Sequence, residues 1–257
     1  RVLGAALADV DRDRYYLATK VGRYGTEDFD FSAGRITRGV DESLNRLGTE
    51  YVDVIQCHDI EFADLNQIVD ETLPALEKIR EAGKARFIGI TGLPLNVSRE
   101  VLGRSEAVDT VLSYCRYTLF DQSLQRLLPS LLAKDLGVIN ASPLSMRLLS
   151  ERGAPDWHPA DKEMRETCAK AAAHCRERGE SIAQLAVQFC VANDDIHTTV
   201  VGTANPDHIR QNVEWAEKPM NRQLLEEVQA ILAPIRDRTW KSGRLENNDP
   251  ETPTEGG

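Results

Sequence analysis

The feature that most constrains the fold is an alternation, from Tyr15 onward, of short apolar runs with longer segments whose apolar residues recur every three or four positions. This order is typical of parallel strands joined by crossover helices. We therefore predict an α/β protein. The expected strands are Tyr16–Thr19, Val52–Gln56, Phe87–Ile90, Thr110–Ser113, Gly137–Asn140 and Thr198–Val201.

The segments between these runs predict helices. Between Ser32, which suits a helix N-terminus, and Gly48, which suits the residue after a helix end, lies one apolar stripe. The stripe consists of Ile36, Val40, Leu44 and Leu47. Further helices are expected at about 73–79, 124–132, 164–178, 182–192, 206–213 and 224–232.

The number of strands indicates which α/β architecture applies. A (β/α)₈ TIM barrel uses about 250 residues for eight units, so six strands match a barrel that lacks roughly two units. Because Arg1 is not methionine and Arg1–Ala8 already has a helical pattern, we expect the N-terminal part of the barrel to be missing. The rival, an open doubly wound sheet, should carry a GxGxxG motif after an early strand, and the sequence has none.

The same pattern sets the expected domain boundaries. We predict one barrel domain over residues 1–245. The last twelve residues, ENNDPETPTEGG, contain almost no apolar side chains. We therefore expect 246–257 to be a disordered acidic tail.

Charge and hydropathy exclude two classes of partner. The chain has 31 basic and 41 acidic residues, a net charge of −10, which repels a phosphate backbone in the absence of a basic patch. Its longest uncharged run, the thirteen residues between Glu180 and Asp194, is shorter than the ~20 apolar residues of a membrane-spanning helix. We therefore expect no nucleic-acid and no membrane partner.

The five cysteines indicate the redox compartment. They are odd in number, form no CxxC pair, and mostly lie in apolar segments, where cysteine packs as a small hydrophobic residue. Cys168 and Cys175 are seven residues apart on one helix, with His174 pointing elsewhere, so packing explains them better than zinc binding. We predict reduced thiols, no metal and a cytoplasmic location.

Polar or small residues close the predicted strands, at the barrel face where chemistry occurs. The first strand ends on Lys20 and the second on His58, which places both over one mouth of the barrel. Taken singly, Lys20 could be a solvent-reaching lysine and His58 a strand-end histidine held by Asp59. Their place on consecutive strands favours a functional interpretation. The other strand ends and following loops carry Thr91, Ser113, Ser142, Leu144, Ser145, Gly202, Thr203, Ala204 and Asn205.

Longer sequence patterns add a resemblance. The segments concerned are Ala18–Lys20, Tyr51–Asp59, Phe87–Thr91, Ala141–Leu144 and Val201–Asn212. In order and spacing they resemble the aldo-keto reductases, over nearly the whole chain up to the acidic tail. The strings CHDIEF at 57–62, GITGLPL at 89–95, LSYC at 112–115 and APDWHPA at 154–160 resemble the L-galactose dehydrogenase branch of that family.

The resemblance implies a catalytic tetrad of Asp, Tyr, Lys and His. Lys20 matches the tetrad lysine, which lowers the pKa of the tyrosine, and His58 matches the histidine that orients the substrate oxygen. The family's Asp and Tyr belong to a strand that this chain does not contain. Tyr15 and Tyr16 do not replace them, because they begin the strand that ends in Lys20.

The resemblance also implies a nicotinamide dinucleotide bound without a Rossmann motif. Thr91 and Ser113 match positions that hold the nicotinamide amide, although Gly92 and Ser113 replace a commoner Asn and Gln. NADP-dependent relatives tend to have basic residues where this chain has Gly202 and His208, so NAD is preferred. The pyrophosphate loop is matched by Ser142, Leu144 and Ser145, with Arg147 nearby, and the adenosine end by Gly202, Thr203, Ala204, Asn205, Gln211 and Asn212.

The activity implied is oxidation of the anomeric carbon of an aldose, L-galactose or a similar sugar, to a lactone by hydride transfer to NAD, within sugar metabolism and ascorbate biosynthesis. The expected partner is a small-molecule sugar, and the chain without the tetrad tyrosine is expected to be inactive. Two alternatives stay open. One is an NADPH-dependent reductase of aldehydes such as pyridoxal, and the other is a non-catalytic regulatory subunit that retains a cofactor; steady-state turnover would distinguish an enzyme from such a subunit.

Overall fold

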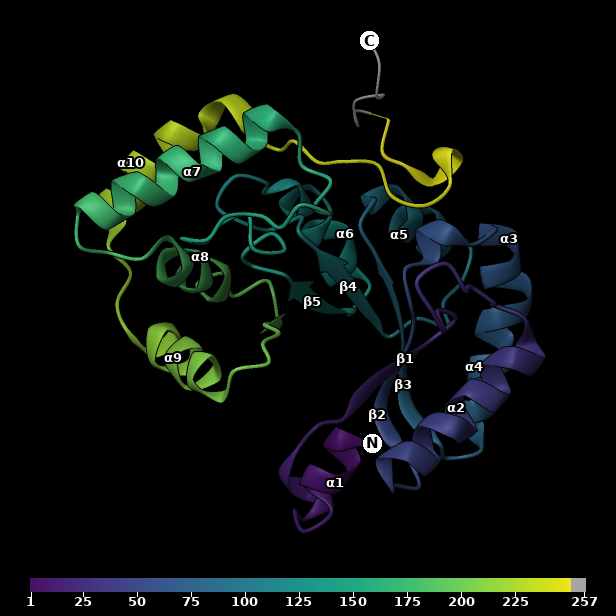
Figure 1. Ribbon diagram of the computed structural model, residues 1–257. Coiled ribbons are helices and arrows are strands. Elements are labelled where there is room, and N and C mark those ends of the chain that lie inside the picture. Colours follow the sequence, from purple (N-terminus) through teal and green to yellow (C-terminus); the bar gives the residue numbers. More distant parts are fainter. Residues whose placement is uncertain (251–257) are drawn as a thin grey trace. The chain divides into compact units, whose positions relative to one another are not determined.

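The chain consists of two compact units in the computed structural model, which describes residues 1–250 (Figure 1). The first unit comprises Arg1–Leu112 together with Ser242–Asp249, and the second comprises Ser113–Lys241 with Pro250. The strand β4 (Thr110–Tyr114) runs from the first unit into the second. Each unit is described by itself below.

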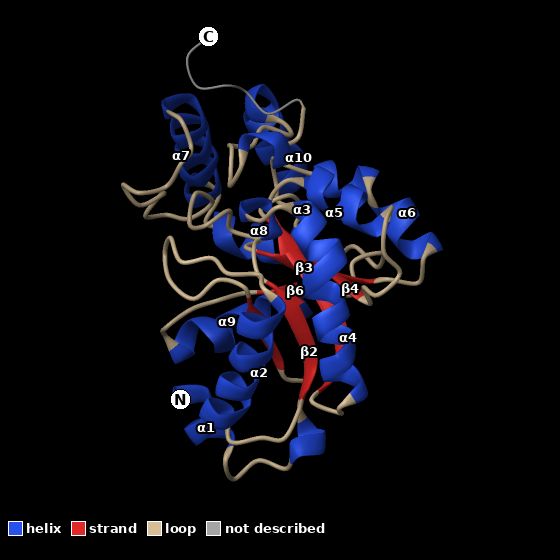
Figure 2. Ribbon diagram, turned by 90° about the vertical axis from the view of Figure 1, so that its right-hand side faces the viewer, coloured by secondary structure: helices blue, strands red, loops and turns tan. Residues whose placement is uncertain are grey.

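The first unit is built on parallel strands separated by helices. Its strands are β1 (Ala18–Val21), β2 (Val52–Cys57) and β3 (Ala85–Gly92), and their register pairs Lys20 with Gln56 and Gln56 with Gly89. Its helices are α1 (Val2–Leu7), α2 (Ala33–Leu47), α3 (Leu65–Gln67), α4 (Leu73–Glu81) and α5 (Leu95–Leu102). Helix α2 packs against β1 and α4, and α4 packs against β3 (Figure 2).

Helix α2 forms where its apolar stripe predicts. Ile36, Val40 and Leu44 are buried, and Gly48 ends the helix in the left-handed conformation with its N–H donating to the Leu44 carbonyl. Ser32 occupies the N-cap position as predicted, but its side chain makes no capping hydrogen bond. Instead the Glu71 carboxylate accepts from the Ala33 N–H at 2.7 Å. A carboxylate close in space but distant in sequence thus takes the role predicted for the local serine.

The second unit continues the alternation. The end of β4 pairs with β5 (Gly137–Ala141) through the Cys115 N–H and the Ala141 carbonyl, and β5 runs parallel to β6 (Thr198–Val200). Its helices are α6 (Leu128–Ala133), α7 (Lys162–Glu177), α8 (Ile182–Val191), α9 (Pro206–Glu217) and α10 (Arg222–Leu232). One apolar cluster joins α7, α8 and α10 and includes Met164, Cys168, Leu185, Leu224 and Val228.

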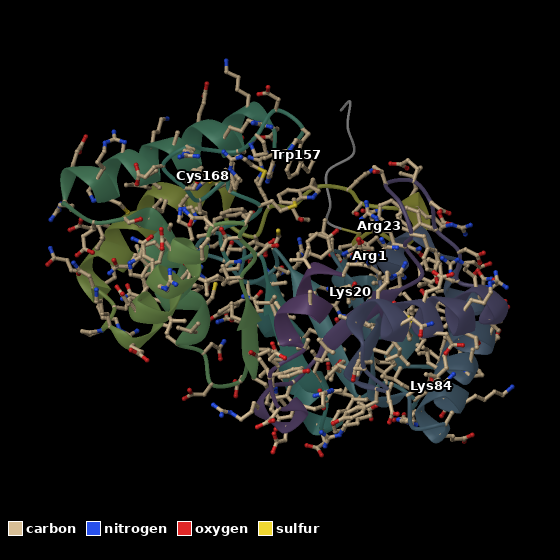
Figure 3. The ribbon with its side chains drawn as sticks, turned by 60° about the horizontal axis from the view of Figure 1, so that its bottom comes forward. Arg1, Lys20, Arg23, Lys84, Trp157 and Cys168 are labelled. Carbon is tan, nitrogen blue, oxygen red and sulfur yellow. The ribbon has the colours of Figure 1, made fainter. Side chains whose placement is uncertain are left out.

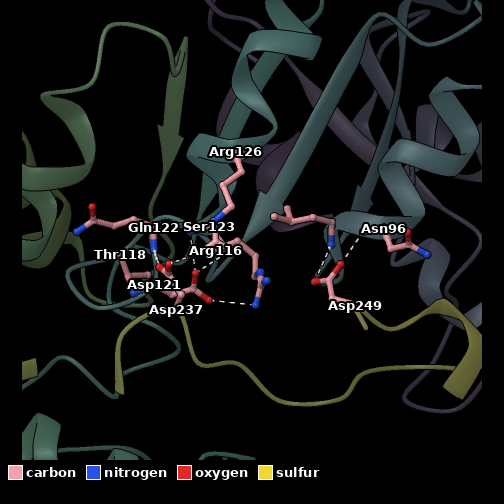
Figure 4. A network of polar contacts seen from close by, with 10 residues as sticks. Asn96, Arg116, Thr118, Asp121, Gln122, Ser123, Arg126, Asp237 and Asp249 are labelled. Carbon is pink, nitrogen blue, oxygen red and sulfur yellow. Dashed lines mark hydrogen bonds and ion pairs between the residues drawn. The ribbon is translucent and has the colours of Figure 1, made fainter. Parts of the chain in front are cut away.

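A buried ion pair folds the segment that leads from β4 to α6 in the second unit (Figure 4). Arg116 Nη1 lies 3.0 Å from an Asp121 carboxylate oxygen, and the Ser123 N–H donates to that carboxylate at 3.0 Å. Burial raises the pKa of Asp121, and the Arg116 charge opposes that rise. Asp237 adds a second contact, accepting from the Gln122 N–H at 2.9 Å. Hydrogen bonds and an ion pair thus hold this irregular segment.

The strand order decides between the two architectures considered. Every strand is hydrogen-bonded to the next one in the chain, in the order β1-β2-β3-β4-β5-β6. A doubly wound sheet reverses its order at a switch point, so that alternative is excluded. All six predicted strands are present within residues 1–250, with ends that differ by a few residues.

Two predicted boundaries differ from the structure. The helix expected at about 124–132 is split into a 3₁₀ turn, Ser123–Arg126, and α6, with Pro129 in the first turn of α6. The disorder expected from Glu246 does not hold for 246–250. Leu245–Asn247 form a 3₁₀ turn and Asn247 is buried, because polar side chains there bond to backbone carbonyls. The rest of that expected tail, 251–257, lies outside the described residues.

Candidate active site

Lys20 and His58 come together in the first unit, at the carboxyl ends of β1 and β2. The His58 N–H donates to the Val21 carbonyl at 2.8 Å, which extends the pairing of the two strands by one residue. The Lys20 side chain is exposed (Figure 3), and the His58 side chain is one-third exposed. Both predicted catalytic residues are therefore adjacent and reachable from solvent.

The surroundings of His58 favour a neutral imidazole. Burial lowers the pKa of His58, the nearby charges of Lys20 and Arg23 lower it further, and the Asp59 carboxylate opposes them. His58 Nε2 lies 3.7 Å from that carboxylate, too far for a hydrogen bond. A neutral ring can donate one hydrogen bond and accept another, which suits contact with a hydroxyl or carbonyl oxygen.

Asp59 is fixed beside His58 by three contacts. Its carboxylate accepts from Arg23 Nη1 at 2.6 Å and from the Thr91 hydroxyl at 3.3 Å, while its own N–H donates to the Thr91 hydroxyl oxygen at 2.8 Å. Its φ of 52° places the backbone in the left-handed region. Arg23 in turn donates to the carbonyls of Gly25 and Thr26. The loop after β2 is thus held by hydrogen bonds within the protein.

The hydrogen bonds to Asp59 bear on the cofactor-binding role predicted for Thr91. The sequence assigns Thr91 to the cofactor, and that assignment stays a prediction. In the structure its hydroxyl both accepts from and donates to Asp59, so its donor is committed within the protein. Sequence reasoning missed Arg23, and only its position three residues after Lys20 could have pointed to it.

The second unit holds the other predicted ligand residues. Within residues 1–250, the Ser113 hydroxyl at the end of β4 is buried and has no hydrogen-bond partner. The loop after β5 has left-handed backbone at Ser142, Ser145, Met146 and Arg147. Left-handed turns of this kind aim backbone N–H groups at anions. An unpartnered buried hydroxyl and such a loop are what a dinucleotide would engage, so the residues fit this cofactor.

His158 holds the loop after β5 by a hydrogen bond to its backbone. Its Nδ1 accepts from the Ala160 N–H at 3.0 Å, so the proton is on Nε2, which donates to the Ser145 carbonyl at 3.0 Å. Burial lowers the pKa of His158, which keeps this tautomer neutral. Leu144 is half-buried, and Arg147 is exposed at the end of the loop. The Ser142–Arg147 loop is therefore ordered, with a cation at its edge.

The segment after β6 lies on the surface of the second unit. Asn205 caps α9 by accepting from the Asp207 N–H at 3.0 Å, and Thr203 Oγ1 lies 3.3 Å from His208 Nδ1. Arg210 pairs with Asp207 at 2.8 Å. The predicted adenosine-binding residues are exposed or half-buried and reachable by a ligand: Gly202, Thr203, Ala204, Asn205, Gln211 and Asn212.

The described residues show neither a metal-binding cluster nor a membrane-spanning helix. Within residues 1–250, no group of three or more His, Cys, Asp or Glu side chains is placed to hold a metal ion. The five cysteines are free and buried, and burial raises the pKa of Cys57 and Cys115 to about 12. None of the helices in this range has the length and apolar character to cross a membrane.

Comparison with known proteins gives consistent matches. The profile of the Aldo/keto reductase family matches residues 1–233. The L-galactose dehydrogenase of Arabidopsis thaliana is 48% identical over 255 residues, which cover 96% of this chain and 80% of that protein. The D-arabinose 1-dehydrogenase of Saccharomyces cerevisiae is 32% identical over 263 residues, covering 95% and 78%. The holo form of aldo-keto reductase AKR11C1 from Bacillus halodurans superposes with a TM-score of 0.72 at 27% identity, over 88% of this chain and 76% of that one.

Proposed function

Because the chain belongs to the aldo/keto reductase family, we propose that it is an NAD-dependent aldose 1-dehydrogenase that oxidises an L-galactose-like sugar to a lactone. Its fold is the (β/α)₈ barrel type of that family, with six strands within residues 1–250. The family consists of oxidoreductases that use nicotinamide cofactors on small molecules. The proposed substrate rests on the 48% identity to L-galactose dehydrogenase over 96% of the chain.

In this proposal the first unit acts on the sugar. Oxidation of the anomeric carbon breaks its C–H bond and releases the hydroxyl proton. The neutral His58 ring holds the sugar oxygen by a hydrogen bond, and Lys20 provides positive charge that favours loss of the proton from a nearby hydroxyl. When bound, the nicotinamide ring supplies the acceptor of the two electrons.

The second unit provides the groups that would hold the dinucleotide. The Ser113 hydroxyl is assigned to the nicotinamide amide, the Ser142–Arg147 loop to the pyrophosphate, and the 202–212 segment to the adenosine end. A 2′-phosphate needs charged donors. Gly202 offers none, and Arg210 is already paired with Asp207, which supports NAD over NADP.

No residue of this chain matches the aspartate and tyrosine of the family tetrad. A positioned general acid or base contributes about 10²- to 10⁴-fold to a rate. We therefore infer that the chain alone turns over slowly. Its five free thiols support a reducing, cytosolic compartment, where sugar oxidation toward ascorbate would take place.

The test compares the chain with a fused form, which adds the part of the Arabidopsis enzyme outside its aligned 80%. Both are incubated with NAD⁺ or NADP⁺ and a panel of aldoses, and reduced cofactor and lactone are measured. We expect the fused form to oxidise L-galactose fastest and with NAD⁺, and the chain to be slower by about 10²-fold or more. Preference for NADP⁺, or oxidation of no aldose by the fused form, would refute the proposal.

A further inference from the structure

Residues Ser242–Asp249 form a segment that we call the C-terminal strap. In sequence it follows the second unit, yet it packs within the first. It lies against the loop after β2, where Ile60–Phe62 form a 3₁₀ turn that begins two residues after His58. The strap therefore meets the loop that carries the catalytic histidine, although 184 to 186 residues separate the bonded positions, Asn247 with Glu61 and Ala63.

The strap holds Glu61 by its backbone and its side chain. The Glu61 carbonyl accepts from the Arg244 N–H and from Asn247 Nδ2, each at 2.9 Å, and the Ser242 hydroxyl donates to Glu61 Oε1 at 3.0 Å. Asn247 Nδ2 also donates to the Ala63 carbonyl at 2.9 Å. At Gly243 a Cβ atom would lie 2.3 Å from the Glu61 carbonyl oxygen, so the approach requires glycine.

The same strap reaches the end of the next strand. Glu61 Oε1 accepts from the Leu93 N–H just after β3 at 3.2 Å, and Glu61 is fully buried. The Asp249 carboxylate accepts from the Leu95 and Asn96 N–H groups, at 3.2 and 2.8 Å, where α5 begins (Figure 4). The strap thus ties the loop after β2 to the loop after β3.

The strap also closes on itself through Asn248. Its Oδ1 accepts from the Ser242 N–H at 2.9 Å, and its Nδ2 donates to the Ser242 and Arg244 carbonyls at 3.1 and 2.7 Å. Asn248 therefore stabilises the strap internally, whereas the neighbouring Asn247 bonds the strap to the loop after β2.

From these contacts we propose that the C-terminal strap positions His58, and that Asn247, which bonds to the carbonyls of both Glu61 and Ala63, is its main positioning residue. Glu61 is held by the strap, and Asp59 is held by Arg23 and Thr91. Only the buried Ile60 lies between these two fixed points. The backbone that leads from His58 therefore has little freedom, and the ring direction follows from it. The catalytic part of this inference rests on the proposed function, whereas the positioning of the ring does not.

The strap acts on His58 through geometry. The charged groups that act on the His58 ring are Lys20 of β1, Arg23 of the loop after β1, and Asp59 next to it in sequence. None of them belongs to the strap. Loss of the strap contact should therefore change the position and mobility of the ring while these three charges stay in the protein.

The test is histidine NMR on the chain itself, which has only five histidines. The His58 Cε1–H signal is identified by its loss in His58→Gln. In Asn247→Ala we expect this signal to shift by more than its linewidth or to broaden, while the signals of His158, His174, His197 and His208 stay in place. A His58 signal unchanged in position and width in folded Asn247→Ala would overturn the proposal.

A matched control separates positioning from loss of stability. Asn221 caps α10 in the second unit by accepting from the Leu224 N–H at 3.1 Å, so Asn221→Ala removes an asparagine hydrogen bond outside the strap and outside the first unit. We expect Asn221→Ala to leave the His58 signal unchanged. If it moves His58 as Asn247→Ala does, the effect is general loosening and the proposal fails.

A second variant and a kinetic measurement complete the test. If Asn247→Ala does not fold, Ser242→Ala removes only the Ser242–Glu61 bond and carries the same two outcomes for the His58 signal. In the fused form, Asn247→Ala should lower kcat about tenfold with the Kd for NAD⁺ unchanged, since a misplaced group costs rate rather than binding. A moved His58 signal with no aldose oxidised by the unmutated fused form would refute the proposed function and leave the positioning inference standing.

Discussion

The two units prepare their predicted site residues in opposite ways. In the first unit the groups around His58 are already bonded to the protein: Asp59 to Arg23 and Thr91, and Glu61 to the strap. In the second unit the buried Ser113 hydroxyl has no partner among residues 1–250, and 202–205 are exposed. We infer that the groups around His58 are oriented by the protein itself, whereas the Ser113 hydroxyl keeps its bonding capacity for a ligand.

The largest effect is expected from Lys20→Met in the fused form. Removing the charge beside His58 should lower kcat by about 10²- to 10⁴-fold, because proton transfer loses its electrostatic support. The Kd for NAD⁺ should stay the same, since Lys20 is not among the residues predicted to hold the cofactor, most of which lie in the second unit. Stopped-flow turnover and a fluorescence titration measure the two quantities.

The control for that variant is Lys78→Met, an exposed lysine on α4 of the same unit. It should change neither quantity. Near-normal kcat in Lys20→Met between pH 6 and 9, or an equal loss in Lys78→Met, would break the assignment of catalysis to the first unit.

Arg23→Met tests whether the first unit is preset. The nearly buried Asp59 carboxylate would lose its 2.6 Å partner, which should cost about 2 kcal/mol of unfolding free energy; the one-third exposure of Arg23 keeps this below the cost of breaking a fully buried pair. The Arg23 charge lowers the pKa of His58, so its removal should raise that pKa. Urea unfolding and an NMR titration of His58 check both.

Arg104→Met provides the comparison for Arg23→Met, because Arg104 makes exposed contacts in the same unit, with Glu100 and Asn66. It should cost well under 1 kcal/mol. An unchanged or lowered pKa of His58 in Arg23→Met would show that this network does not govern the histidine.

Ser113→Ala tests the second unit. The hydroxyl has no hydrogen-bond partner among the described residues 1–250, so its removal should leave the unfolding free energy within about 0.5 kcal/mol. The Kd for NAD⁺ should rise about fivefold, the value of one hydrogen bond to a ligand. Calorimetric titration measures the Kd for NAD⁺, and thermal unfolding measures the stability. A clear loss of stability with an unchanged Kd would show that the Ser113 hydroxyl serves the fold and not the cofactor.

The smallest effect is expected from His208→Arg at the adenosine end. An exposed added cation contributes up to about 1 kcal/mol, so the ratio of NADP⁺ to NAD⁺ affinity should rise by a few-fold. Arg210→Gln is the informative companion, because Arg210 is paired with Asp207 and its loss should leave that ratio unchanged. Binding of both cofactors to the two variants is measured at fixed ionic strength. A constant ratio in His208→Arg would remove this segment from cofactor selection.

Local patterns predicted the scaffold well. The six strands and the stripe of Ile36, Val40 and Leu44 follow from apolar periodicity, which depends on neighbours in the chain. The pair Lys20 and His58 follows from the rule that parallel strands present their carboxyl ends together. These features are readable because each follows from local periodicity or from the general geometry of parallel strands.

The features that escaped prediction depend on contacts between distant residues. Composition indicated a disordered tail at Glu246, yet Asn247 bonds to the carbonyls of Glu61 and Ala63. Ser32 has the preferred identity for a helix cap, but Glu71 supplies the acceptor. No local pattern shows which polar side chain will find a backbone group far along the chain, so the support of the site was not predictable.

We expect the first unit to be held by its own hydrogen bonds and the second to be completed by the cofactor. Amide hydrogen exchange, measured with and without saturating NAD⁺, distinguishes the two units. Residues 58–63 should be protected in the free chain and change little, while 142–147 and 202–208 should gain protection with NAD⁺. Rapid exchange of 58–63 in the free chain, or no response of 142–147 and 202–208 to NAD⁺, would contradict this expectation.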